Sequence, residues 1–170
     1  MVQIRKANIE DATQLSLLSI QTFTESFAEY NTPENLELFL AATYNIPTLR
    51  NEIEDPQVSF FLAYVHDDLH GYAKIIEPLE DSTIAAASEI ELARIYILKA
   101  SKQIGIGSAL LQRVIAFAKE KNYTAIWLGV WEYNPSAIAF YKKWGFEKYG
   151  EHIFMLGTDQ QNDWLMRKML

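Results

Sequence analysis

The chain has 170 residues, of which 49% are hydrophobic and 22% charged, and its net charge is −7. These proportions are ordinary for a globular protein, and we expect one domain over residues 1–170. No apolar run reaches the roughly 18–20 residues of a membrane helix, and the N-terminal residues lack the apolar stretch of a signal peptide. Because cysteine is absent and the three histidines are scattered, we expect no disulfide, no cysteine nucleophile and no metal site. We expect a cytoplasmic protein without membrane contact.

The charge is unevenly distributed along the chain. Residues 1–90 contain 15 Asp and Glu against 4 Lys and Arg, whereas residues 91–170 contain 7 against 11. One interpretation is that acidic helices solubilise one face; the other is a basic side for an anionic ligand and an acidic side for a cationic one. Nucleic acid is disfavoured because the positive half has no dense Lys/Arg stripe.

The first half of the chain predicts a strand, three helices and a β-hairpin, followed by a loop. An apolar stripe predicts one long amphipathic helix over Ile9–Tyr30, and Thr32-Pro33 is a typical helix start. The remaining predicted elements are a strand at Val2–Ala7, a short helix from Pro47 to before Pro56, strands at Val58–His66 and Leu69–Pro78, and a loop at Glu80–Ser88.

The second half alternates strands with helices. The expected elements are strands at Glu89–Leu98 and Thr124–Trp131, helices at Gly107–Asn122 and Asn134–Trp144, and a closing hairpin of Phe146–Leu156 with Asn162–Leu170. The order predicts a mixed α/β sheet covered by helices.

A glycine-rich loop joins the strand at Glu89–Leu98 to the following helix. Gly105 and Gly107 permit positive φ and close backbone approach, and Lys102 lies beside them. Backbone amides at a helix N-terminus favour a diphosphate. An isolated Gly-x-Gly is more often a plain turn into a helix. A dinucleotide fingerprint is excluded because Leu110 stands where it requires glycine.

The second informative segment runs from Asn134 to Phe146. Asn134 and Pro135 suit an N-cap and first helical residue, which is a complete structural explanation for both. From the sequence pattern alone, Tyr141 is compatible with a core tyrosine whose hydroxyl is bonded elsewhere.

A carboxylate on a central strand is unusual enough to suggest a function. Strict alternation along Glu89–Ile97 puts Glu91 on one face with Ile95 and Ile97. The competing interpretation is an ion pair between Glu91 and Arg94 or a neighbouring strand.

The glycine loop and the Asn134–Phe146 segment together resemble the pyrophosphate-binding loop and following helix of the GNAT acetyltransferases, and the element order is similar over nearly the whole chain. The resemblance implies the α/β (α+β) GNAT fold, a mixed, mostly antiparallel sheet of about seven strands flanked by helices. It also implies transfer of an acetyl group from acetyl-CoA to a primary amine by direct attack in a ternary complex, without a metal.

The resemblance also implies the site residues. Tyr141 would protonate the CoA thiolate. The pKa of a phenol exceeds that of a thiol, and this difference costs about 2 kcal/mol. Glu91 would act as the base. Direct transfer from an ammonium to an ordinary glutamate is uphill by roughly 8 kcal/mol, so water or shifted pKa values are required. The Ile97 amide would polarise the thioester carbonyl. The implied cofactor-binding residues are Ile95, Tyr96, Ile97, Lys102, Gln103, Ile104, Gly105, Ile106, Gly107, Ser108, Asn134, Ala137, Tyr141 and Lys143. Lys102 departs from the Gln or Arg of the family and cannot form a bidentate fork.

Four segments are similar to the PaiA-type bacterial polyamine acetyltransferases: Thr22–Phe27, Asn31–Asn35, Glu91–Ile97 and Ile126–Glu132. This similarity implies spermidine or spermine as acceptor, bound near Glu25, Glu29, Glu34 and Trp131, by a monomer or homodimer. The alternatives are a GNAT enzyme acting on a protein N-terminus or another amine, and a CoA-binding regulatory module without catalysis.

Overall fold

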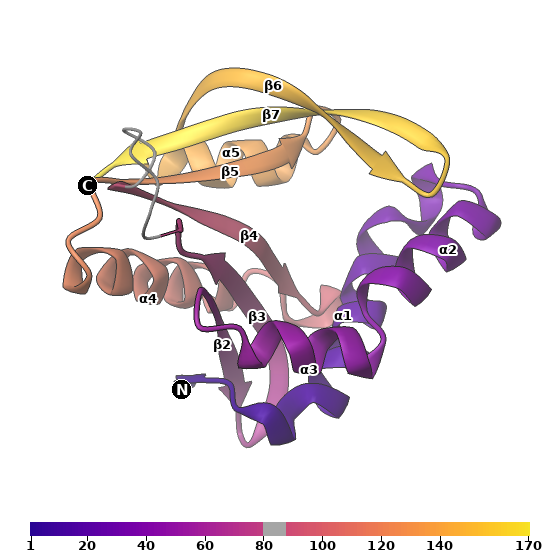
Figure 1. Cartoon of the computed structure of the whole chain (residues 1–170), viewed down its shortest axis with the longest axis horizontal. Coiled ribbons are helices and arrows are strands. Elements are labelled where there is room, and N and C mark those ends of the chain that lie inside the picture. The colour runs from indigo at the N-terminus through magenta and orange to yellow at the C-terminus, as the bar shows by residue number, and fades with distance from the viewer. Residues whose placement is uncertain (80–87) are drawn as a thin grey trace.

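The computed structural model describes residues 1–79 and 88–170 (Figure 1). The predicted loop at Glu80–Ser88 lies, except for its last residue, outside the described residues. The elements are β1 (Val2–Lys6), α1 (Ala12–Phe27), α2 (Pro33–Thr43), α3 (Ile46–Glu54), β2 (Val58–Val65), β3 (Asp68–Ile76), β4 (Glu89–Ile97), α4 (Ile106–Glu120), β5 (Ala125–Trp131), α5 (Pro135–Lys143), β6 (Glu147–Leu156) and β7 (Asp159–Met169).

The strands form one seven-stranded sheet in the order β1-β2-β3-β4-β5-β7-β6, in which only β4 and β5 are parallel neighbours. This confirms the predicted mixed, mostly antiparallel sheet of about seven strands. β4 and β5 pair only where Glu89–Glu91 meet Ala125–Trp127. Beyond these residues the two strands separate, as Figure 1 shows, and the sheet opens into two halves.

Side-chain caps fix where the helices begin. Thr32 accepts a hydrogen bond from the Asn35 amide at α2, and Asn134 accepts one from the Ala137 amide at α5. Both predicted caps are therefore confirmed. The single long helix predicted over Ile9–Tyr30 is wrong at its ends, where 3₁₀ turns occupy Ile9–Asp11 and Ala28–Tyr30. The physical reason lies in polar side chains that compete for the backbone, since Asn8 caps the first turn and Asn31 Nδ2 donates to the Phe27 carbonyl.

Each face of the sheet has its own hydrophobic core. On one face α4 buries Leu110, Leu111 and Val114 against the strands, and α5 contributes Tyr141. On the other face α1 and α3 bury a second cluster that includes Leu15 and Leu49. The sheet therefore lies between helices on both faces, and each set of helices is held by its own core.

A β-bulge at Ala93 changes which side chains of β4 share a face. Register with β3 passes from Ile75–Leu92 to Lys74–Arg94, so Ala93 has no partner. Leu92 and Ile95 consequently pack in the same core, under α4. The predicted alternation is therefore wrong beyond residue 92, and Glu91 does not share a face with Ile95 and Ile97.

On the α3 side of the sheet, one carboxylate serves two cations. Glu52 Oε1 lies 2.6 Å from Lys74 Nζ, and Glu52 Oε2 lies 2.9 Å from an Arg94 guanidinium nitrogen. All three side chains are largely buried, and burial lowers the pKa of Lys74. Removing the shared carboxylate would leave two buried cations facing each other, which is far costlier than losing an exposed ion pair.

We therefore expect Glu52→Gln to lower the free energy of unfolding by about 3 kcal/mol. Glu54→Gln, an exposed position on the same helix, is the matched control and should change it by less than about 0.5 kcal/mol. Urea denaturation followed by circular dichroism measures both. Equal stability of the two variants would show that the Glu52 cluster contributes nothing.

Candidate active site

A large cleft of about 730 Å³ opens beside the diverging ends of β4 and β5. Its wall contains most of the cofactor-binding residues predicted from the sequence, drawn from β4, the glycine loop and α5. They are Ile95, Tyr96, Ile97, Lys102, Gln103, Gly105, Gly107, Ser108, Asn134, Ala137 and Tyr141. The sequence analysis missed other residues of this wall, including Lys99, Tyr133, Ser136 and Phe140.

The two glycines of the loop act for different physical reasons. Gly105 has φ +91°, and a Cβ added there would meet no atom within 4 Å, so the backbone is left-handed and faces open space. Gly107 does not have positive φ, so of the two uses expected for these glycines it serves the close approach. A Cβ at Gly107 would lie 3.0 Å from Ile97 Cδ1 and 3.6 Å from Phe140, so Gly107 permits close packing instead.

The loop ends at the N-terminus of α4, whose first residues donate no hydrogen bond within the helix. The first intrahelical amide is that of Ala109, which donates to the Gly105 carbonyl. The earlier amides, from Ile106 to Ser108, are therefore directed out of the helix end toward the cleft. With Lys99 and Lys102 in the same wall, this region of the cleft suits an anion.

The divergence of β4 from β5 also frees two backbone amides of β4. The Leu98 amide donates to the His70 carbonyl on the β3 side. Because successive amides of a strand point to opposite edges, Tyr96 faces β3 while Ile95 and Ile97 face the gap left by β5. Ile95 and Ile97 are thus placed to offer a backbone amide to a ligand, as predicted, and Tyr96 is not.

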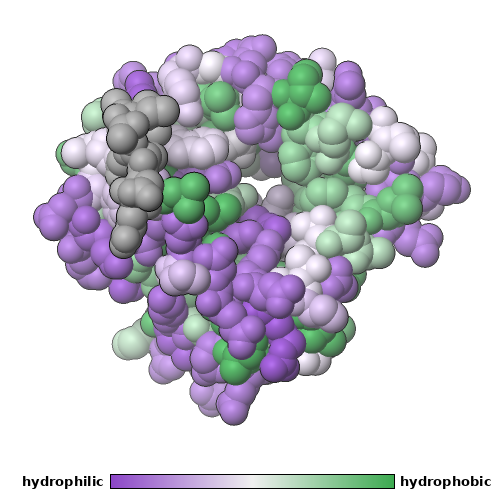
Figure 2. Space-filling view, in the orientation of Figure 1, coloured by the Kyte–Doolittle hydropathy of each residue, from purple (hydrophilic) through white to green (hydrophobic). Residues whose placement is uncertain are grey.

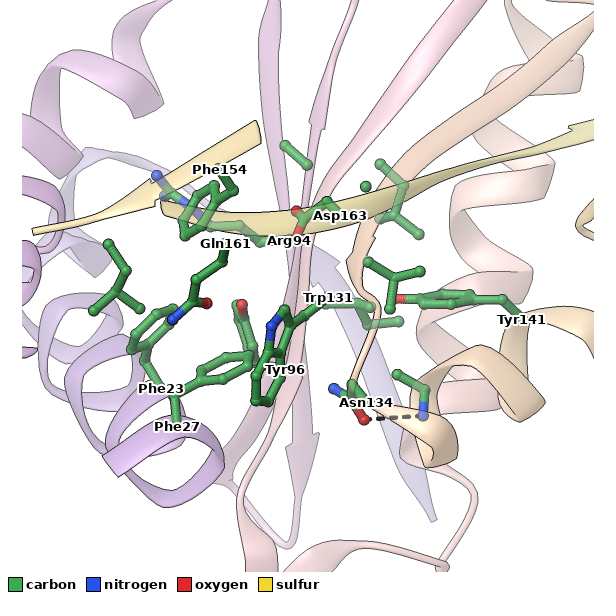
Figure 3. Close-up of a pocket in the computed structure, with 17 residues that line it drawn as sticks. Phe23, Phe27, Arg94, Tyr96, Trp131, Asn134, Tyr141, Phe154, Gln161 and Asp163 are labelled. Carbon is green, nitrogen blue, oxygen red and sulfur yellow. Dashed lines mark hydrogen bonds between the residues drawn. The ribbon is translucent and has the colours of Figure 1, made fainter. Parts of the chain in front are cut away.

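A second, smaller cavity of about 140 Å³ adjoins the cleft (Figure 3). Its wall is strongly aromatic, with Phe23 and Phe27 from α1, Tyr96 from β4, Trp131 from β5 and Phe154 from β6. The space-filling view in Figure 2 shows a hollow at the middle of this face of the molecule. Phe27, Tyr96 and Trp131 line the cleft as well, so the two spaces meet at these rings.

Tyr141 stands at the junction of the two spaces. It lines both of them, approaching from α5 through the opening between β4 and β5 (Figure 3). The residue is only 7% exposed, and burial raises the pKa of its phenol. Among the described residues none makes a hydrogen bond to the Tyr141 hydroxyl, so the core alternative, a hydroxyl bonded elsewhere, has no partner to support it.

The smaller cavity contains two charged residues that the sequence analysis did not select. Arg94 belongs to the Glu52 cluster, so its charge is balanced from α3. Asp163, on β7, is the one carboxylate among the described residues that line this cavity. Burial raises the pKa of Asp163, although nearby His152 acts in the opposite direction. No sequence motif marks Asp163, because its position depends on the register of β7.

The predicted carboxylates lie elsewhere. Glu91 lines neither space, and burial raises the pKa of its carboxyl. Glu25 and Glu29 line the large cleft, not the aromatic cavity, and Glu34 lines neither. Burial of Glu25 raises its pKa, but hydrogen bonds from the Lys99 amide and from Gln21 outweigh burial, and the pKa is lowered overall.

Three further residues predicted to bind the cofactor line neither space: Ile104, Ile106 and Lys143. Ile106 is fully buried in the core under α4, because the first turn of that helix packs inward there. Ile104 and Lys143 are exposed outside both walls.

The Asn31–Asn35 segment, which contributed to the resemblance, anchors the β6–β7 hairpin. Asn31 Oδ1 accepts a 2.7 Å hydrogen bond from Gln161, a residue of the aromatic cavity. Asn35 Oδ1 accepts bonds of 3.0 Å from both the amide and the hydroxyl of Thr158. The start of α2 therefore fixes the strands that form one wall of that cavity.

Within the described residues, no helix is long and apolar enough to cross a membrane. In the same part of the chain, no group of three or more His, Cys, Asp and Glu side chains is arranged to hold a metal ion.

Comparison with known proteins agrees with this geometry. The sequence matches the acetyltransferase (GNAT) family over residues 20–146. An uncharacterised N-acetyltransferase in the pepI 3′ region of Lactobacillus delbrueckii subsp. lactis is 32% identical over 169 residues, covering 99% of this chain and 98% of the relative. The spermidine N(1)-acetyltransferase of Thermoplasma acidophilum is 28% identical over 152 residues, covering 86% and 88%.

Among solved structures, the PaiA N-acetyltransferase from Thermoplasma acidophilum in complex with coenzyme A superposes with a TM-score of 0.83 at 23% identity, covering 100% of this chain and 99% of the other. The amides at the start of α4, the two lysines and the volume of the cleft also suit the diphosphate and arm of coenzyme A. The chain belongs to the GNAT acetyltransferase family and is an acetyl-CoA-dependent N-acetyltransferase.

Proposed function

We propose that this enzyme acetylates a primary amine of a polyamine such as spermidine or spermine. The observation that carries the proposal is the aromatic cavity beside Tyr141, in whose wall Asp163 is the one carboxylate among the described residues. Aromatic faces and a carboxylate together favour an alkylammonium over a neutral or anionic substrate. Similarity to a spermidine N(1)-acetyltransferase over most of both chains supports the same substrate class.

The large cleft would hold acetyl-CoA, which supplies an acetyl group activated as a thioester. The amides of Ile106–Ser108 would bind its diphosphate, with Lys99 and Lys102 adding positive charge. The amides of Ile95 and Ile97 would bind the arm and polarise the thioester carbonyl. Asn134 already caps α5 with its side-chain oxygen, which leaves its Nδ2 group to donate into the cleft.

Tyr141 would donate a proton to the departing thiolate. Its raised pKa keeps the phenol protonated at neutral pH, and the same apolar surroundings make a thiolate beside it more basic. Glu91 stays a predicted base. Its raised pKa suits a proton acceptor, but its position outside both walls means that it would act through water.

The substrate class is tested with a panel of spermidine, butylamine and an alanine-terminated peptide. We expect spermidine to have the highest kcat/KM, and its kcat/KM to fall more steeply with added salt than that of butylamine, because exposed charges are screened. Glu29→Gln should raise the KM of spermidine more than that of butylamine, whereas Glu37→Gln, outside both spaces, should raise neither. Preference for the peptide would assign the enzyme to protein N-termini, and no turnover with any amine would indicate a binding module.

Tyr141→Phe should lower kcat about 10²- to 10⁴-fold while leaving the affinity for CoA unchanged, because only the proton donor is lost. Tyr149→Phe, at an exposed position of β6, is the control. Stopped-flow thiol release measures the chemical step. A parental single-turnover rate for Tyr141→Phe would rule out general acid catalysis by this residue.

Gly105→Ala should weaken CoA binding about 10- to 100-fold. Relief of the left-handed φ would turn a following amide away from the diphosphate, and losing one such hydrogen bond costs roughly 1.5–3 kcal/mol. Gly145→Ala is a matched control, since Gly145 also has positive φ, at +83°, but lies outside the cleft. Backbone strain from each alanine should cost about 1–2 kcal/mol, so we expect the free energy of unfolding to fall by a similar amount in both variants. Titration calorimetry that finds parental CoA affinity in Gly105→Ala would contradict the assignment of the loop.

A further inference from the structure

Asp163 and His152 form a pair that leads from the aromatic cavity to the surface. β7 places Asp163 opposite Trp131 of β5 on one side and opposite His152 of β6 on the other. Asp163 Oδ2 lies 3.7 Å from His152 Nε2, a distance that a small side-chain rotation shortens to that of a hydrogen bond. The Asp163 side chain is 13% exposed and that of His152 is 44% exposed, so the pair connects a buried carboxylate with solvent.

The neighbouring strand leaves room for this pair. A Cβ at Gly129 of β5 would lie 3.3 Å from Asp163 Oδ2 and 3.4 Å from His152 Nε2. Any larger residue at this position would press on both side chains, and Gly129 itself lines the cavity. The space that the Asp163 and His152 side chains need therefore explains the glycine at position 129.

We propose that Asp163, in place of Glu91, binds the acceptor ammonium and takes its proton, and that His152 passes this proton to solvent. The proposal rests on acetylation of an amine, but not on that amine being a polyamine. Acetylation removes two protons from the ammonium as the nitrogen bonds to the acetyl carbon and the C–S bond breaks. One proton leaves through Asp163 and His152, and the other replaces the proton that Tyr141 gives to the thiolate.

The surroundings of the pair are compatible with this route. Among the described residues, the titratable and charged groups that share the cavity wall with Asp163 are Arg94 and Tyr96 on β4 and Tyr141 on α5. Glu91 lies within electrostatic reach of His152. Arg94 is occupied by Glu52, which leaves the Asp163 carboxylate available for an incoming cation. The raised pKa of Asp163 reduces the uphill step from an ammonium, whose ordinary pKa is about 10.4.

The direct experiment is the steady-state kinetics of Asp163→Asn with butylamine and with spermidine. We expect the KM of both amines to rise about tenfold or more and kcat/KM to fall about 10²- to 10³-fold, while the KM of acetyl-CoA is unchanged. The acidic limb of the kcat/KM–pH profile should disappear, because the group that must be deprotonated is gone. Glu147→Gln, an exposed carboxylate of β6, should retain parental kinetics.

His152 is tested by chemical rescue. His152→Ala should lower kcat about tenfold. Added imidazole should restore kcat, because the half-exposed site admits a small base. The control His66→Asn, at an exposed turn, should keep the parental kcat without imidazole. Gly129→Ala, which crowds the pair without removing it, should lower kcat/KM in the same direction.

Parental kcat/KM in Asp163→Asn, with either amine, would overturn the proposal. So would retention of the acidic limb in Asp163→Asn together with its loss in Glu91→Gln, which would assign the proton to Glu91. Failure of imidazole to rescue His152→Ala would remove His152 from the route. Because butylamine is used throughout, a lack of preference for spermidine in the amine panel leaves this test unaffected.

Discussion

The separation of β4 from β5 after three paired residues is the constraint on which the site depends. A continuous ladder would use the amides of Ile95 and Ile97 and close the opening through which Tyr141 reaches the cavity. The bulge at Ala93 lies just beyond the last paired residue, and bulges increase the local twist of a strand. β5 instead pairs with β7 along its whole length, from Ala125 to Trp131.

Each half of the opened sheet would supply a different part of the proposed chemistry. β4 presents backbone donors and leads into the glycine loop, whereas β5 and β7 present Trp131 and Asp163. The two halves are held at a fixed separation by contacts outside the sheet. Glu25 of α1 binds the Lys99 amide beyond β4, and Asn31 and Asn35 bind the β6–β7 hairpin. The α1–α2 segment therefore spans the opening and connects both halves.

The sequence was sufficient to predict the parts of the site that depend on local patterns. The glycine loop, the cap at Asn134 and the placement of Tyr141 on α5 follow from residues adjacent in the chain, and all three lie where expected. The alternation along β4 failed because a bulge inserts one residue and reverses the faces beyond it. Asp163 was missed because only strand register brings it opposite Trp131 and His152.

The uneven charge of the chain supports less about the substrate than local patterns do. Counting acidic residues in the first half ignores that several of them are already bound within the protein. Glu52 neutralises two buried cations, Asp11 pairs with Arg5, and Glu77 accepts a bond from Tyr123. Among the described residues, Asp163 lines the aromatic cavity and Glu25 and Glu29 line the cleft, and a sum over the chain cannot distinguish these carboxylates from the bound ones.

The central claim is that the gap between β4 and β5 receives acetyl-CoA through the free amides of β4. Residue-resolved amide hydrogen exchange, measured by NMR with and without CoA, tests it most directly. Without ligand, Ile95 and Ile97 should exchange faster than Tyr96 and Leu98, which face β3, and CoA should slow Ile95, Ile97 and the amides of Ile106–Ser108. Protection already present at Ile95 and Ile97 without ligand, or no change when CoA binds, would contradict this account of the site.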